Sequence, residues 1–506
     1  MSRSLAILRA RLRPSRGNGA DGLLVRDGRI ALVGASEEIV RALPPDAERV
    51  EAGGRVLVPG FQDAHFHFLQ YGRVLLRPSL ARCASREEML AAIDGAHRAR
   101  PDGGLLFLEG WDESAWTPAR APVRADLDAI APDRPVVARR VCGHFAVANG
   151  AALARLAERW PGDGVAADSG HVVEEPALEL DELFPPDDVE GPAALRAAGA
   201  ACLALGITTA SDFLRPRGLA VYARALAREE LPVRVTAWVL PECFAKDGSI
   251  PGDPGVSDRF VVRGLKVFFD GTIGGRTAAL FADYADRPGE RGRLLLSGAE
   301  LRELVLRAHG VGRPVAIHTI GDRAIAAALD VFEALPREEI LECGHRLEHV
   351  ELPRAPDRAR LARLGVRPCV QPNFLRWAGP GGLYETALGS ERVRAMNPFR
   401  SLLEEGCRPF FGSDGMPASP SLGIRWALDH PVASERLSLD DAVRLYTEAA
   451  ATPGRAARGR LEAGEPADLA LLADLPDRLE GDGLADLTWI DGRAVHRVAL
   501  EAPRAP

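Results

Sequence analysis

The sequence contains almost no lysine. Of its 63 basic residues only two, Lys246 and Lys266, are lysines, and all the others are arginines. Arginine stays protonated in proteins, whereas a buried lysine amine can become neutral and act as a nucleophile. A lysine kept in such a chain is therefore a candidate for chemistry that arginine cannot perform. Lys246 lies in a polar, turn-rich segment typical of a solvated loop, but Lys266 lies in the strand-like run RGLKVFFDG.

Other features are also missing. The seven cysteines are odd in number and form no C-x-x-C pair, which favours reduced thiols over a disulfide framework. No run approaches eighteen apolar residues, and the first residues show no apolar signal segment. The net charge of −8 argues against nucleic acid as a partner, and no G-x-x-x-x-G-K loop is present to cradle phosphate. We therefore expect a cytoplasmic protein that binds neither membranes nor nucleic acid.

Strand-like runs alternate with helical stretches between residues 56 and 451, a pattern typical of parallel β/α units. After a first strand that ends near residue 68, the expected strands are 206–212, 233–240, 265–270, 314–320, 346–350, 367–372 and 409–414. Eight such strands predict the α/β class, specifically a (β/α)₈ TIM barrel.

The two ends of the chain are rich in short strands with hairpin signals. Residues 1–55 and 455–506 are predicted to pair into one composite β-sandwich, because chain termini often lie close together. The barrel would then comprise residues 56–70 and 195–454. The intervening stretch, 71–194, is too long for a βα loop and is predicted to be an insertion over the mouth of the barrel.

Side chains able to bind metal follow several of the predicted strands. His65 and His67 share one face of a strand by alternation, roughly 7 Å apart at the backbone. Lys266 lies on strand four, His318 on strand five, His349 at the end of strand six and Asp414 at the end of strand eight. Barrels place their chemistry at the carboxyl ends of the strands, where these residues would meet. His345 lies further back on strand six, and we expect it to be structural.

Several motifs together resemble those of the amidohydrolase superfamily, and more narrowly its YtcJ-like branch, amidohydrolase family 3, which includes N-substituted formamide deformylases. The motifs are PGFQDAHFHF, LKVFFDGTIGGRTAAL, VAIHTIGDRAI, HRLEHVEL, FGSDGMP, GWDESAW, CGHFAVANG and ADLALL…DGRAV. They occur in the family's order and cover nearly the whole chain.

This resemblance implies a centre of two divalent metal ions, zinc being expected. One ion would take His65 and His67 and the other His318 and His349, with a CO₂-derived carbamate on Lys266 between them. Asp414 would contact the first ion and serve as general base while a metal-activated hydroxide attacks. The implied activity is hydrolysis of a non-peptide C–N bond in a small-molecule N-acyl or N-formyl amine or another small amide. A homodimer stays open as the assembly of this chain.

Weaker candidates for substrate binding are His144, Arg276 and Trp111. Arg276 ends the glycine-rich loop DGTIGGR, which is also typical of a tight βα turn, and packing roles are open for His144 and Trp111. Glu348 alternates away from His349 and would point outward or support the site from behind.

Two other functions stay open. One is a mononuclear deaminase-type site, or a cyclic-amide or lactone hydrolase, on the same barrel; a deaminase would need an acidic residue soon after His318, where the sequence reads TIGDRA. The other is a non-catalytic binding protein that kept the barrel, although a retired site would be expected to show gaps in its ligand set.

Overall fold

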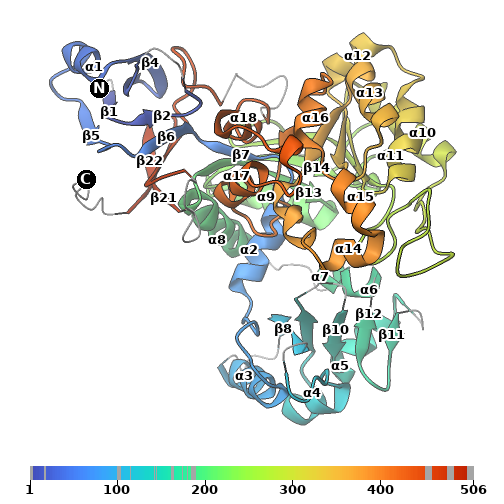
Figure 1. Ribbon diagram of the computed structural model, residues 1–506. Helices are drawn as coiled ribbons and strands as arrows, with labels where there is room; N and C mark the ends of the chain where they lie inside the picture. Colours follow the sequence, from blue (N-terminus) through green and yellow to red (C-terminus); the bar gives the residue numbers. More distant parts are fainter. Residues whose placement is uncertain are drawn as a thin grey trace. The chain divides into compact units, whose positions relative to one another are not determined.

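The protein is described from a computed structural model (Figure 1). The described residues are 4–15, 19–99, 104–113, 116–141, 143, 145–160, 164–173, 175–178, 180–183, 190–450, 459–475 and 484–498. The chain divides into two compact units, one formed by Met1–Leu69 with Ala198–Pro506 and the other by Gln70–Ala197.

A sheet of eight parallel strands forms the centre of the first unit and confirms the predicted barrel. In order these strands are β7 (Phe61–Asp63), β13 (Ile207–Leu214), β14 (Arg234–Val239), β15 (Phe260–Phe268), β16 (Val315–Thr319), β17 (Arg346–His349), β18 (Arg367–Val370) and β19 (Phe410–Phe411). The edge strands also meet, because the amide of Ala64 donates to Phe411 O (3.3 Å) and that of Asp414 to His65 O (2.7 Å). The sheet therefore closes on itself.

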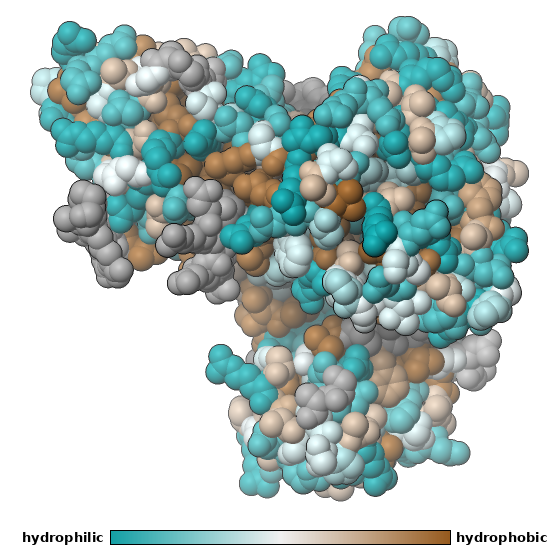
Figure 2. All heavy atoms as spheres, viewed as in Figure 1, coloured by the Kyte–Doolittle hydropathy of each residue, from teal (hydrophilic) through white to brown (hydrophobic). Residues whose placement is uncertain are grey.

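Helices follow the strands and cover the outside of the barrel (Figure 1). They and the short 3₁₀ turns of this unit are α9 (Pro216–Ala227), η2 (Pro241–Cys243), α10 (Gly298–His309), α11 (Asp322–Phe332), α12 (Arg337–Cys343), α13 (Ala355–Leu364), η3 (Pro372–Trp377), α14 (Leu383–Leu388), α15 (Ser390–Ala395), α16 (Phe399–Glu404), α17 (Pro420–Leu428), η4 (Ala433–Glu435) and α18 (Leu439–Leu445). In α10, Ser297 and Glu300 form a capping box, while Leu301 and Val305 are buried. On the face drawn in Figure 2, hydrophilic side chains cover most of this helical layer.

The chain termini form two packed sheets, as the strand-rich ends of the sequence predict. One sheet has the order β4 (Arg29–Gly34), β3 (Gly22–Arg26), β1 (Ser4–Leu8), β5 (Glu48–Glu51), and helix α1 (Ser36–Ala42) covers it. The other has the order β2 (Arg11–Leu12), β6 (Val56–Pro59), β20 (Leu469–Leu472), β21 (Ala485–Ile490), β22 (Arg493–Arg497). Apolar side chains of both sheets, including Leu23 and Trp489, share one core. Strand β6 belongs to this sandwich, so the barrel begins at β7, after the boundary predicted at residue 55.

The second unit has a five-stranded sheet of its own. Its elements are α3 (Arg86–Ala99), β8 (Leu106–Trp111), α4 (Arg124–Ile130), β9 (Val136–Arg140), β10 (Phe145–Ala148), α5 (Gly150–Ala157), β11 (Val165–Ala166), β12 (His171–Val173), α6 (Glu175–Leu178) and α7 (Leu180–Leu183), with α2 (Phe68–Leu76) and α8 (Glu190–Ala204) running across its two boundaries with the first unit. The strand order is β11-β12-β10-β9-β8. That this unit covers the barrel mouth stays a prediction. Within the described residues, every helix is too short or too polar to cross a membrane.

A buried cation joins the barrel to the sandwich. Arg234, the first residue of β14, is fully buried and contacts Asp468 (3.0 Å), Asp491 (2.6 Å) and Asp258.

A buried charge that loses its partner destabilises a fold strongly. We therefore expect Arg234→Met to lower the free energy of unfolding by about 3–5 kcal/mol, measured by urea denaturation. Arg425→Met, which breaks the exposed ion pair between Arg425 and Asp429, is the control and should have little effect. Equal effects of the two substitutions on the free energy of unfolding would contradict this account.

Candidate metal centre

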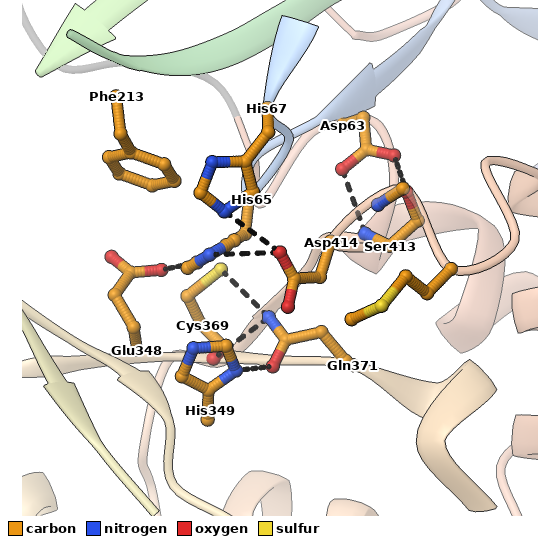
Figure 3. Close-up of polar contacts among 12 residues, drawn as sticks. Asp63, His65, His67, Phe213, Glu348, His349, Cys369, Gln371, Ser413 and Asp414 are labelled. Atoms are coloured by element: carbon orange, nitrogen blue, oxygen red, sulfur yellow. Dashed lines mark hydrogen bonds and ion pairs between the residues drawn. The ribbon is translucent and has the colours of Figure 1, made fainter. Parts of the chain in front are cut away.

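Two histidines and one aspartate meet where strand β7 ends (Figure 3). His65 and His67 follow the last strand residue, Asp63, and their rings are 5.6 Å apart. The Nε2 atoms of His65 and His67 lie 3.5 Å and 3.0 Å from Oδ1 of Asp414. His65 is buried, whereas the His67 side chain is 37% exposed. One carboxylate oxygen therefore faces two imidazole nitrogens, one of them from a side chain that solvent can reach.

The loop after β19 is fixed to β7 by a set of short contacts. Asp63 accepts hydrogen bonds from the Ser413 amide (2.8 Å) and hydroxyl (2.5 Å), and the amide of Asp414 donates to His65 O. Gly412 packs so closely against His65 that a Cβ atom on Gly412 would lie 2.4 Å from the backbone nitrogen of His65. Asp414 has a φ of 56°, which a non-glycine residue adopts rarely. These contacts hold Asp414 in a strained conformation that directs its carboxylate toward the histidines.

His349 and His318 complete a cluster of imidazoles on three strand ends. The His349 ring centroid lies 4.6 Å from that of His65 and 4.5 Å from that of His318. His349 donates from Nδ1 to Gln371 Oε1 (2.8 Å), and His318 donates from Nε2 to Gly271 O (3.1 Å). The other nitrogen of each ring therefore carries a free lone pair. It is Nε2 in His349 and Nδ1 in His318.

Lys266 lies among these rings. Its side chain is fully buried, and within the described residues Nζ has no hydrogen-bond partner. The amine lies 4.3 Å from the ring centroid of Phe213 and 4.9 Å from that of Phe268. Burial lowers the pKa of Lys266 to about 8, against the pull of Glu348. The amine therefore exists in part as the neutral, nucleophilic form near neutral pH.

The three buried imidazoles are neutral. Burial, followed by the charge of Lys266, lowers the pKa of His65 far below its usual value and that of His318 to about 3. Burial and the neighbouring His318 do the same to the pKa of His349. Metal ions bind the neutral form of imidazole, so these rings need not lose a proton before coordination.

The donor atoms of His65, His67 and Asp414 have the spacing of a metal site. Two ligands of one tetrahedral zinc ion lie roughly 3.3 Å apart, and the contacts of His65 and His67 with Asp414 bracket this value. A second group, His65, Glu348 and Cys369, also gathers possible ligand atoms. Its His65–Glu348 separation of 2.5 Å is too short for two ligands of one ion and is that of a hydrogen bond. The donor set that fits a cation is thus His65, His67 and Asp414, three of the six ligands predicted from the sequence.

A third group, His309, Cys343 and His345, lies away from this centre. The Val315 amide donates to His345 Nδ1 (3.1 Å), so the proton of that ring is on Nε2, which donates to His309 Nδ1 (3.0 Å). His309 Nε2 in turn donates to Glu339 (2.8 Å). The ring nitrogens are already engaged in a hydrogen-bonded chain, in keeping with the structural role expected for His345.

The conformation at the end of β17 was not foreseen. By alternation, His345 and His349 would share a face of the strand. The His345 ring instead packs against Phe332 of α11 in the helical layer, with the two ring centroids 5.2 Å apart. His349 has a φ of 69°, which ends the alternation and turns its ring toward the barrel mouth. Glu348 contacts His65 directly and so supports the site from behind, which is one of the two placements expected for it.

Sequence reasoning gave no role to four residues that support this centre: Gln371, Phe213, Asp63 and Ser413. Gln371 follows β18 and could have been noticed as a polar side chain at a predicted strand end. The ring centroid of Phe213 lies 4.5 Å from that of His65 and 5.1 Å from that of His67. In the sequence, however, an aromatic residue in a strand is typical of the hydrophobic core. The Asp63–Ser413 contact joins positions 350 residues apart, and no local pattern predicts it.

The three weaker candidates lie elsewhere or cannot be placed. Arg276 pairs with Asp286 (2.6 Å) and donates to Gly274 O (2.7 Å), which gives it a role within its own loop. Trp111 is fully buried in the core of the second unit and donates to Ala138 O (3.1 Å). This placement favours packing over substrate contact. His144 lies outside the described residues.

The chain matches known proteins over most of its length. A model of the amidohydrolase family matches residues 48–496. The amidohydrolase YtcJ of Bacillus subtilis is 29% identical, over 95% of this chain and 96% of that protein. The N-substituted formamide deformylase of Arthrobacter pascens is 28% identical, over 97% of this chain and 98% of that protein. The crystal structure of an uncharacterized metal-dependent hydrolase from Pyrococcus furiosus has a TM-score of 0.77 and 27% identity, over 92% of this chain and 98% of that one.

The contacts between β7 and the loop after β19 lead to a test. Asp63→Ala removes both hydrogen bonds to Ser413, and we expect the amide of Asp414 to lose its protection because the bond to His65 O opens more often. Hydrogen exchange of a peptide covering residues 410–416, followed by mass spectrometry, measures this. Ser438→Ala, which removes the N-cap of α18, should leave that peptide unchanged. Unaltered exchange in Asp63→Ala would show that these bonds do not hold the loop.

Proposed function

The chain belongs to the amidohydrolase family, and from this premise we propose that it is a metal-dependent hydrolase of non-peptide C–N bonds in small N-acyl or N-formyl amines. The observation that carries the proposal is the convergence of His65, His67 and Asp414 at separations suited to one cation. Family membership supports an enzymatic hydrolase. The name of the formamide deformylase from Arthrobacter pascens supports the substrate class, since that relative matches over nearly its whole length.

Asp414 and five other side chains would hold two divalent cations, with zinc the first to test. His65 and His67 would bind one through Nε2, and His318 and His349 would bind the other through Nδ1 and Nε2, the nitrogens left free by their hydrogen bonds. Lys266 would hold a CO₂-derived carbamate, which would supply a further oxygen ligand. Its burial and lack of a hydrogen-bond partner among the described residues support this role, because a buried amine without a partner is unstable as a cation.

Bound divalent ions would lower the pKa of water and polarise a substrate carbonyl. The chain supplies the proton transfers. The Asp414 carboxylate would accept the proton that water loses as its oxygen attacks the carbonyl carbon. It would return this proton to the leaving nitrogen when the C–N bond breaks, so that a carboxylic acid and an amine are released. Phe213 lies against His65, His67 and Lys266 and would exclude other water from them.

Removal of metal and loss of the base should have different effects. We expect chelation to abolish hydrolysis of a panel of N-formyl and N-acyl amines and Zn²⁺ to restore it. Asp414→Asn should keep the other ligands and bind metal, yet lose about 10²–10⁴-fold in kcat, since a general base typically contributes that much. Metal analysis and steady-state kinetics measure both. Unchanged turnover in Asp414→Asn would remove it as the base. Hydrolysis of cyclic amides or lactones alone would contradict the substrate class.

The two lysines offer a matched pair of variants. Lys266→Ala should lose at least about 100-fold in activity, in line with loss of a group that supports a metal site, and small carboxylic acids should restore part of it. Lys246→Ala, at an exposed position, should be unaffected. In the unaltered protein, ¹³C NMR after exposure to ¹³CO₂ should show one carbamate signal that is absent from Lys266→Ala. Full activity without Lys266 would refute the bridging role.

A further inference from the structure

His65 is held from two sides. Its Nε2 atom faces Asp414, while Nδ1 contacts Oε2 of Glu348 at 2.5 Å (Figure 3). Both His65 and Glu348 are buried, with 1% and 0% of their side chains exposed. The contact joins the segment just after β7 to strand β17. Because both side chains are buried, solvent does not compete with it.

The contact determines which nitrogen of His65 carries the proton. A carboxylate oxygen accepts hydrogen bonds, so Nδ1 of His65 donates to Oε2 of Glu348. A neutral imidazole has a single N–H, and Nε2 is therefore left with its lone pair directed toward Asp414. Without Glu348 the ring could turn or exchange tautomers, and the proton would then occupy the nitrogen that has to bind a cation.

Arg346 pairs with Glu348. Its Nε atom lies 2.5 Å from Oε1 of Glu348, two residues along the same strand and on the same face. The guanidinium packs against the ring of Trp238, 4.1 Å from its centroid, and is itself buried. This contact fixes the Glu348 carboxylate in place beside His65.

We propose that Arg346 and Glu348 are positioning residues, which hold His65 in the orientation and tautomer that bind a divalent cation and so set the affinity for it. The proposal rests on the proposed metal-dependent function. Partners of metal-binding histidines commonly act in this way, and their loss weakens metal binding.

The test removes the pair without leaving a buried charge. In the double variant Arg346→Met with Glu348→Leu, neither partner is left alone. We expect the affinity of the full chain for Zn²⁺ and Co²⁺, measured by competition with a chromogenic chelator, to fall about 10–100-fold. The visible spectrum of bound Co²⁺ should also change. Glu348→Gln, which still offers an oxygen acceptor but no charge, should fall between the double variant and the unaltered protein.

Glu339→Gln provides a matched control. It alters another carboxylate–histidine contact, that of Glu339 with His309, which lies in the hydrogen-bonded chain away from the centre. This variant should bind both cations with unchanged affinity. An effect equal to that of the double variant would mean that any such change loosens the fold, and would overturn the proposal.

The remaining outcomes separate this proposal from the proposed function. If the unaltered chain binds Zn²⁺, His65→Ala abolishes binding and the double variant binds within about twofold of the unaltered chain, the positioning role alone is wrong. If the unaltered chain binds neither cation, both proposals fall together. If neither the double variant nor Glu348→Gln folds, the pair is a folding element and the positioning role is likewise overturned.

Discussion

The hydrogen bonds between the end of β7 and the loop after β19 close the barrel and at the same time build its site. Asp63 holds both the amide and the hydroxyl of Ser413, and the next residue, Asp414, donates its amide to His65 O. Because β19 has only two residues, its own ladder contributes little to this closure. The loop contacts therefore carry much of it. They also keep Asp414 at a positive φ, so that strain at the site is balanced by bonds one residue away.

The polar interior of the barrel is organised by burial. Away from water, the imidazoles favour their neutral forms and the pKa of the Lys266 amine falls to about 8. The Arg346–Glu348 ion pair contacts His65 directly from the barrel interior.

Sequence patterns predicted the strands and placed the candidate donors near strand ends, because local patterns reveal strand ends and the strand ends of a parallel barrel share one rim. The scarcity of lysine also singled out Lys266, which the structure buries among the histidines. Local patterns could not reveal that His349 leaves the strand geometry, and they could not decide whether Glu348 points outward or supports the site from behind. The run Val56–Pro59 looked like the start of a barrel strand, since an apolar run indicates burial but not in which sheet. Gln371 was missed because a single polar residue has no periodicity.

The account stands on a cation bound by side chains from several strands at one rim of the barrel. Crystals grown with Zn²⁺ and measured on both sides of the zinc absorption edge would locate such cations directly. Anomalous density is predicted between His65 Nε2, His67 Nε2 and Asp414 Oδ1, with a second peak beside Lys266 and His318. The account would be contradicted by an absence of density there, or by density only at the cluster of His309, Cys343 and His345.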